Sequence, residues 1–168
     1  IIVFPYAHGG SLKNYMRKRL NWVNKLDILR HMLYGLNDIH KIGLVHRDLH
    51  PGNFLHYRRT ISVSDLGLCC PADDETGSEK VYGVIPFIAP EVLDGGPYTQ
   101  ASDVYSIGMI MWFINSGQYP FFNRKYDEIL INDIVNGLRP KIPEGTPPDY
   151  GKLMQDCWDV DPHKRPTI

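Results

Sequence analysis

The chain has 168 residues, of which 43% are hydrophobic and 22% charged, and its net charge is −1 at pH 7. This size and balance predict one domain with a real hydrophobic core, and a near-neutral charge argues against a nucleic-acid partner or an anionic membrane surface. No apolar run reaches the roughly 20 residues that cross a bilayer, so we also expect no membrane span.

The N-terminal residues predict a buried strand over Ile1–Phe4 and a turn at Pro5 and Gly9-Gly10. Ser11 is placed to cap a short basic helix, LKNYMRKRL. The sequence begins in the middle of this expected strand and stops as abruptly at KRPTI, so we expect a piece of a longer protein.

The clearest helix is predicted from about Val23 to Ile42, with Gly43 as its C-cap. Its leucines recur every three or four residues and predict one buried face. These residues are Leu26, Leu29, Leu33 and Leu36.

Two short apolar runs, Phe54–Tyr57 and Ile61–Ser64, predict a β-hairpin closed by Arg58-Arg59-Thr60. Ser102–Asn115 carries large apolar side chains on every side, which predicts the central helix of the domain. Two further amphipathic helices are expected. They span Tyr126–Asn136 and Tyr150–Trp158. The expected fold is therefore mainly α, with a short hairpin.

The three cysteines, Cys69, Cys70 and Cys157, form a poor disulfide framework because their number is odd and two are adjacent. This pattern favours a reducing compartment, so we expect an intracellular and cytoplasmic protein.

The densest polar chemistry lies in residues 44–55, LVHRDLHPGNFL. Asp48 and Asn53, together with Asp65 after the next strand-like run, supply the hard oxygen ligands that suit Mg²⁺ on substrate phosphates. Asp48 would remain able to accept a proton, while His46 and Arg47 would fix the loop or meet an anion. The alternative is that each residue is structural, with Asp65 capping a turn.

A zinc site built from His46, His50, Cys69 and Cys70 is a weaker interpretation, because adjacent cysteines lack C-x-x-C spacing. The other histidines are assigned to helix or surface positions. They are His8, His31, His40, His56 and His163.

Three short motifs occur in succession along the chain. HRDLHPGN matches H-R-D-L-x-x-x-N, Asp65-Leu66-Gly67 resembles D-F-G with Leu for Phe, and Ala89-Pro90-Glu91 supplies A-P-E. The chain resembles a eukaryotic protein kinase, and specifically its C-terminal lobe. Its closing segment, CWDVDPHKRPT, resembles that of tyrosine-kinase-like and tyrosine kinases. The chain as a whole looks closest to tyrosine-kinase-like serine/threonine kinases.

The resemblance implies that residues 1–168 are a partial kinase domain comprising the hinge and the C-lobe. Residues 1–12 would be the end of an N-lobe strand and the hinge, and residues 65–91 would be the activation segment. Pro5, Ala7 and Leu55 would surround adenine.

The resemblance also implies phosphoryl transfer from Mg-ATP to a Ser or Thr hydroxyl of a protein substrate. The expected catalytic set is Asp48 as base with His46, Arg47 and His50 around it. Asn53 and Asp65 would hold Mg²⁺ and contact ATP. Arg47 would meet an activating phosphate on the 65–91 segment. The candidate acceptors are Thr76, Ser78 and Tyr82.

Three further residues are implied to be structural. Asp103 would accept backbone N–H groups of the catalytic loop, and Arg165 would pair with Glu91.

The sequence departs from the kinase pattern at two positions near the base. His50 stands where serine/threonine kinases carry a phosphate-contacting Lys, and Gly83-Val84 stands where they commonly have Gly-Thr. Gly83 still favours a serine/threonine kinase over a tyrosine kinase.

No G-x-G-x-x-G loop or V-A-I-K-like strand occurs in these residues, so the N-lobe is expected to be a missing partner and the isolated chain nearly inactive. Two hypotheses remain, an active kinase represented by its C-lobe and a non-catalytic, kinase-like binding module. The presence of Asp48, Asn53 and Asp65 together favours the first.

Overall fold

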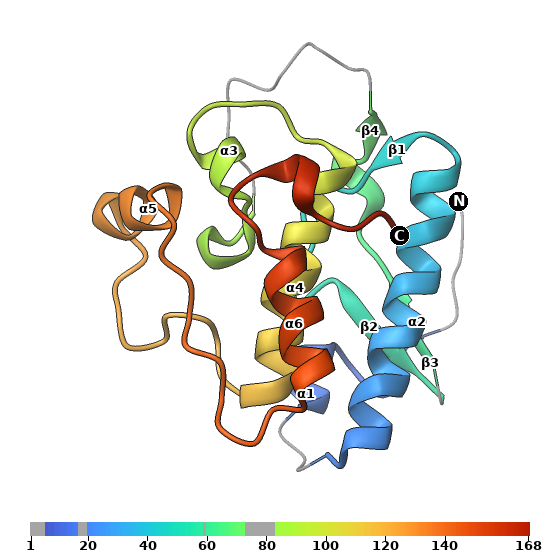
Figure 1. Ribbon diagram of the computed structural model, residues 1–168. Coiled ribbons are helices and arrows are strands. Elements are labelled where there is room, and N and C mark those ends of the chain that lie inside the picture. Colours follow the sequence, from blue (N-terminus) through green and yellow to red (C-terminus); the bar gives the residue numbers. More distant parts are fainter. Residues whose placement is uncertain (1–5, 17–19, 59, 73–82) are drawn as a thin grey trace.

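The computed structural model describes residues 6–16, 20–58, 60–72 and 83–168 (Figure 1). The expected strand Ile1–Phe4, the hinge residue Pro5 and the phosphorylation candidates lie outside the described residues. Those candidates are Thr76, Ser78 and Tyr82.

Helix α4, Gln100–Ser116, is the centre of the fold, and its residues are buried without a break from Ser102 to Ile114. Figure 1 shows it running behind α6, Pro148–Cys157, with α2, Trp22–Lys41, beside it. A helix that is apolar all round can be stable only where neighbours cover every face. The predicted central helix is therefore confirmed.

The ends of α4 follow from its sequence. Thr99 and Ser102 form a capping box, in which each side chain accepts the other's backbone N–H. Gly117 ends the helix with φ +73°, a left-handed conformation that glycine adopts without a steric penalty.

Helix α2 begins after Asn21, whose side chain accepts the N–H of Asn24, and ends before Gly43. Its buried residues are Ile28, Leu29, Met32 and Leu36. The predicted leucine face is wrong at its start, since Leu26 is 51% exposed. The buried stripe also includes Ile28 and Met32, so leucine spacing alone places the face incorrectly.

The described residues form two antiparallel pairs of strands, which make two separate small sheets. β2, Phe54–Tyr57, pairs with β3, Thr60–Val63, as the predicted hairpin, and this hairpin packs on α2. β1, Leu44–Val45, pairs with β4, Cys70–Pro71, which the sequence did not predict. Residues 46–53 therefore start at β1 and end at β2, and Asp65 follows β3 closely.

The remaining elements are short. The predicted helix after Ser11 is α1, Leu12–Tyr15, and the segment predicted at 126–136 is α5, Glu128–Val135, which packs against α3, Pro90–Leu93. The 3₁₀ helices are η1, Leu66–Leu68; η2, Ile85–Phe87; and η3, Pro162–Lys164. The fold is mainly helical with two small sheets, in agreement with the predicted class.

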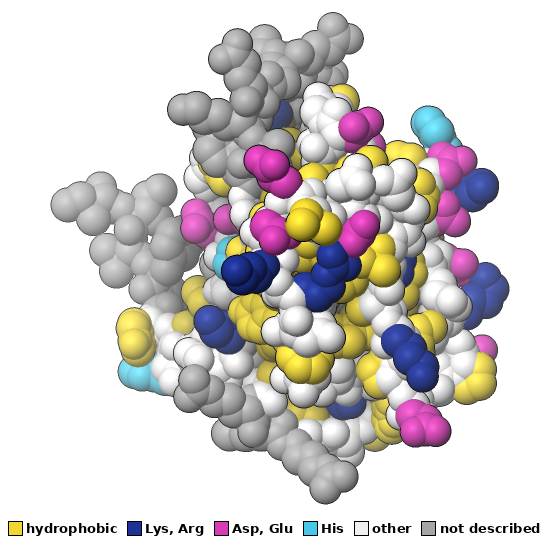
Figure 2. All heavy atoms as spheres, turned by 90° about the vertical axis from the view of Figure 1, so that its left-hand side faces the viewer, with side chains coloured by type: hydrophobic (Ala, Val, Ile, Leu, Met, Phe, Trp, Pro, Cys, Tyr) yellow, Lys and Arg dark blue, Asp and Glu magenta, His cyan; other side chains and the backbone are white. Residues whose placement is uncertain are grey.

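The face drawn in Figure 2, on the side of α5, mixes basic, acidic and hydrophobic side chains. Charges of both signs lie close together there, so neither sign dominates the field of that face. Among the described helices, none combines the length and the apolar character needed to cross a membrane.

Candidate active site

The loop that follows β1 is held by a buried carboxylate on α4. Asp103 is 1% exposed; its Oδ2 accepts the N–H of His46 at 2.8 Å and its Oδ1 accepts the N–H of Arg47 at 3.1 Å. Hydrogen bonds from N–H groups to an ionised acceptor are among the stronger ones in proteins. One side chain thus fixes two successive peptide groups of the loop.

Sequence reasoning missed a third partner of this carboxylate. Nε2 of His40, in the last turn of α2, lies 2.9 Å from Asp103 Oδ2, and the His40 side chain is only 7% exposed. His40 is a helix residue as assigned, but it is not a surface one. No local pattern reveals a contact between positions this far apart in the chain.

The buried His46 ring links the loop to the end of β3. Its Nδ1 accepts the N–H of Asp48 at 3.3 Å, and its Nε2 lies 3.1 Å from the carbonyl oxygen of Ser64. Because Nδ1 accepts a hydrogen bond, the proton of the neutral ring belongs on Nε2, which donates to Ser64. Arg47, which lies between His46 and Asp48 in the chain, adopts φ 72°. Its guanidinium lies 5.6 Å from the centre of the Tyr98 ring.

Asp48 lies at the centre of the loop and is partly buried. The Asn53 side chain donates Nδ2–H to Asp48 Oδ2 at 3.0 Å and to the Asp48 carbonyl oxygen at 2.9 Å. Interaction with His50, and then with Asn53, holds the pKa of Asp48 below its usual value, against the opposing effect of burial. Asp48 is therefore a carboxylate at neutral pH and can accept a proton.

Ser64, the residue after β3, is hydrogen-bonded to Asn53. The backbone N–H and the hydroxyl of Ser64 both donate to the Asn53 carbonyl oxygen, at 2.9 and 2.8 Å. Asp65, the next residue, has φ 61° and an exposed position. Since Nδ2 of Asn53 is turned to Asp48, its Oδ1 is the atom suited to a cation. An amide oxygen and a carboxylate fit a hard divalent cation such as Mg²⁺.

A pocket of about 540 Å³ lies beside these residues, and Ala7, Leu55 and Asp65 all line it. Its wall is mainly apolar and includes Leu66. An apolar pocket with an acidic group at one side has the character of a small-molecule site. The structure thus gathers three of the predicted cofactor-contacting residues, while Pro5 lies outside the described part.

Gly83 lies against the base. A Cβ at this position would be 3.2 Å from Asp48 Oδ1, and the residue has φ +112°. Both features restrict the position to glycine. Val84, the next residue, lines a small pocket together with Gly83 and Asp48. An apolar side chain therefore lies where the kinase pattern commonly has a hydroxyl.

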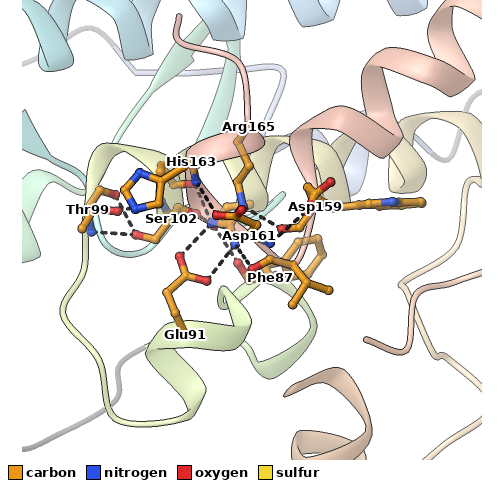
Figure 3. A network of polar contacts seen from close by, with 12 residues as sticks. Phe87, Glu91, Thr99, Ser102, Asp159, Asp161, His163 and Arg165 are labelled. Atoms are coloured by element: carbon orange, nitrogen blue, oxygen red, sulfur yellow. Dashed lines mark hydrogen bonds and ion pairs between the residues drawn. The ribbon is translucent and has the colours of Figure 1, made fainter. Parts of the chain in front are cut away.

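Arg165 and Glu91 form a separate network, shown in Figure 3. Nη1 and Nη2 of Arg165 lie 2.7 Å from Oε1 and Oε2 of Glu91, and Nη1 and Nε also donate to the carbonyl oxygens of Ala101 and Asp159, each at 2.9 Å. The Arg165 side chain is fully buried. Its donors are used by the fold, so this pair connects η3, α3 and α4.

The zinc interpretation is wrong. Within the described residues, which include His46, His50, Cys69 and Cys70, no three histidine, cysteine or acidic side chains gather as a metal site. Burial, with Asp103 nearby, raises the pKa of Cys69 to about 11, so without a bound cation its sulfur is a thiol.

The comparisons with known proteins agree with this geometry. The family model described as protein tyrosine and serine/threonine kinase matches residues 1–168. A probable serine/threonine-protein kinase of Dictyostelium discoideum is 32% identical over 99% of the chain, and a mitogen-activated protein kinase kinase kinase of Drosophila melanogaster is 31% identical over 98%. The chain spans 10% of the length of the first relative and 15% of the second. The chain belongs to the protein tyrosine and serine/threonine kinase family.

Proposed function

We propose that this chain carries the base and the metal ligands of a kinase that transfers a phosphoryl group from Mg-ATP to a Ser or Thr hydroxyl of a protein. The observation that carries the proposal is the Asp48 carboxylate, kept ionised chiefly by His50 and oriented by Asn53 in a loop that Asp103 fixes. The names of relatives that are serine/threonine-protein kinases support the choice of acceptor.

Each residue of the site has a role in this proposal. Asp48 orients the acceptor hydroxyl and takes its proton, which is general-base catalysis. Asn53 and Asp65 hold Mg²⁺, which when bound neutralises charge on the phosphates. Ala7 and Leu55 contact adenine in the pocket that they line.

The proposal extends to the domain boundaries. Residues 1–12 are the end of an N-lobe strand and the hinge, and the rest form a C-lobe in which residues 65–91 are the activation segment. Residues 1–5 and 73–82 of these segments lie outside the described residues. Arg47 meets a phosphate on that segment. The glycine-rich loop and the strand lysine of the kinase pattern are absent from these 168 residues, and we infer that a second lobe supplies them in the intact protein.

Replacing the base tests the proposal. Asp48→Asn in the intact protein should lower kcat for transfer from Mg-ATP to a basic protein substrate by about 10³-fold, because an amide accepts no proton. The control is Asp38→Asn, the same change at an exposed position of α2. Equal activity in Asp48→Asn and wild type would contradict the role of Asp48. Absence of transfer by the wild-type protein would favour a kinase-like binding module.

A further inference from the structure

A second histidine of the loop, His50, lies beside the base. Its Nε2 is 3.7 Å from Asp48 Oδ2, and its Nδ1 accepts the backbone N–H of Gly52 at 3.0 Å. The side chain is 21% exposed. His50 occupies the position at which the kinase pattern places a lysine. The sequence puts it in the expected catalytic set but does not say what its imidazole does there.

The Gly52 contact decides which ring nitrogen carries the proton. A nitrogen that accepts a hydrogen bond has a free lone pair, so Nδ1 of His50 is unprotonated and the neutral ring has its hydrogen on Nε2. This hydrogen is on the side of the ring that faces Asp48. The hydrogen bond from Gly52 therefore leaves the His50 ring with its N–H donor, Nε2–H, on the side of Asp48.

The two oxygens of Asp48 are not equivalent. Oδ2 accepts from Asn53 at 3.0 Å and is the oxygen that faces His50. Oδ1 is the oxygen nearer to Gly83, where a Cβ would lie 3.2 Å away. A Cβ at position 83 would crowd this second oxygen, and glycine leaves the space beside it free.

We propose that His50 is a positioning residue, whose neutral ring donates Nε2–H to Asp48 Oδ2 and leaves Oδ1 as the oxygen that takes the substrate proton. The proposal rests on the proposed kinase function. In that step Asp48 Oδ1 receives the proton of the hydroxyl whose oxygen bonds to the γ-phosphorus. The bond from this phosphorus to the bridging oxygen breaks, and ADP leaves with its electron pair. The 3.7 Å separation shortens to a hydrogen bond once the reacting groups are bound, as is common for catalytic contacts.

Gly52 offers a way to move the ring without touching its chemistry. A Cβ on residue 52 would lie 2.5 Å from Cε1 and 2.8 Å from Nδ1 of His50, so Gly52→Ala must displace the imidazole. The backbone of Gly52 is outside the left-handed region, and alanine therefore adds contact rather than backbone strain. Gly151→Ala is the matched control, since a Cβ there makes only ordinary contacts of 3.7 and 3.8 Å.

The first measurement is nitrogen-15 NMR of the histidine rings in the intact protein at neutral pH. The expected spectrum shows His50 with an unprotonated Nδ1 and a protonated Nε2, a pattern lost in Gly52→Ala and kept in Gly151→Ala. A His50 ring protonated at Nδ1 in the wild-type chain would overturn the proposal. This result does not depend on any activity.

The second measurement is the kinetics of the intact protein. His50→Ala should lower kcat about tenfold, the effect of one hydrogen bond to a charged group, and leave both KM values within about twofold. His50→Gln, whose side-chain N–H can reach the place of Nε2, should retain kcat within about threefold, whereas His50→Asn should behave like alanine. Equal kcat in His50→Ala and wild type, or equal rescue by Asn and Gln, would overturn the proposal.

The outcomes separate this inference from the proposed function. Full activity of Asp48→Asn would contradict the proposed kinase mechanism, whichever tautomer His50 adopts. An inactive Asp48→Asn together with an Nδ1–H tautomer of His50 would remove only the inference about His50.

Discussion

Two polar networks meet the first turns of α4, and they use buried charge in opposite ways. The Arg165 network is saturated, because its guanidinium donates to Glu91 and to backbone carbonyl groups and is fully buried. The Asp103 network ends on the base, Asp48, whose side chain is 18% exposed. A network whose donors are all used stabilises the fold, while a network that ends on an accessible carboxylate holds a catalytic group in position.

The largest effect should come from breaking the saturated network. Glu91→Gln removes the negative partner of a buried guanidinium and should cost about 3 kcal/mol of unfolding free energy, because the Arg165 charge is left without compensation. Chemical denaturation measures this change. Glu128→Gln, at an exposed position of α5, is the control and should change stability by less than about 0.5 kcal/mol. Equal values for the two variants would show that the buried pair stabilises nothing.

The next effect should come from the loop anchor. Asp103→Asn replaces one acceptor oxygen by an NH₂ group that faces an N–H donor, so stability should fall by about 2 kcal/mol. Unlike Glu91→Gln, it should also lower the kcat of the folded protein, because the loop that carries Asp48 loses its support. Denaturation and steady-state kinetics on the same sample measure both. Unchanged kcat in folded Asp103→Asn would mean that the loop keeps its shape without this carboxylate.

A close contact between two helices gives a smaller effect that belongs to neither network. A Cβ on Gly108 of α4 would lie 2.9 Å from Cβ of Cys157 on α6, so Gly108→Ala should cost about 1–2 kcal/mol by overpacking. Gly151→Ala in α6 is the control. Thermal unfolding of both variants measures the difference, and a Gly108→Ala variant as stable as wild type would contradict the close approach of the two helices.

The smallest effect concerns pH. The pKa of Asp48 is lowered in the folded state, so its contribution to stability is complete above the ordinary carboxyl pKa and is lost as pH falls through the lowered value. The difference in unfolding free energy between wild type and Asp48→Asn should therefore be constant from pH 5 to 8 and move against wild type below about pH 4. A change between pH 6 and 8 would show that the pKa is raised instead.

The sequence predicted features whose signals are local. Apolar density identified α4, Gly43 marked the end of α2, and motif spacing brought Asp48, Asn53 and Asp65 into one hypothesis. The structure extends this hypothesis with hydrogen bonds that join Asp48 to Asn53 and Asn53 to Ser64.

Features that depend on distant contacts could not be predicted. β1 and β4 are two residues each, too short for an alternating pattern, and they pair only because the fold brings them together. The contact between His40 and Asp103 and the ring orientation set by Gly52 likewise depend on three-dimensional packing. Leu26 is the opposite case, because it fits the regular leucine spacing of α2 but its side chain is exposed and lies outside the core.

The measurement that tests the central claim most directly is kcat per folded molecule for Asp48→Asn and Glu91→Gln in the intact protein. We predict a loss of about 10³-fold in kcat for Asp48→Asn with a stability change below about 1 kcal/mol. Glu91→Gln should lose about 3 kcal/mol of stability while its folded fraction keeps kcat within about threefold. Retention of wild-type kcat by folded Asp48→Asn would contradict the assignment of the base and the distinction between the two networks.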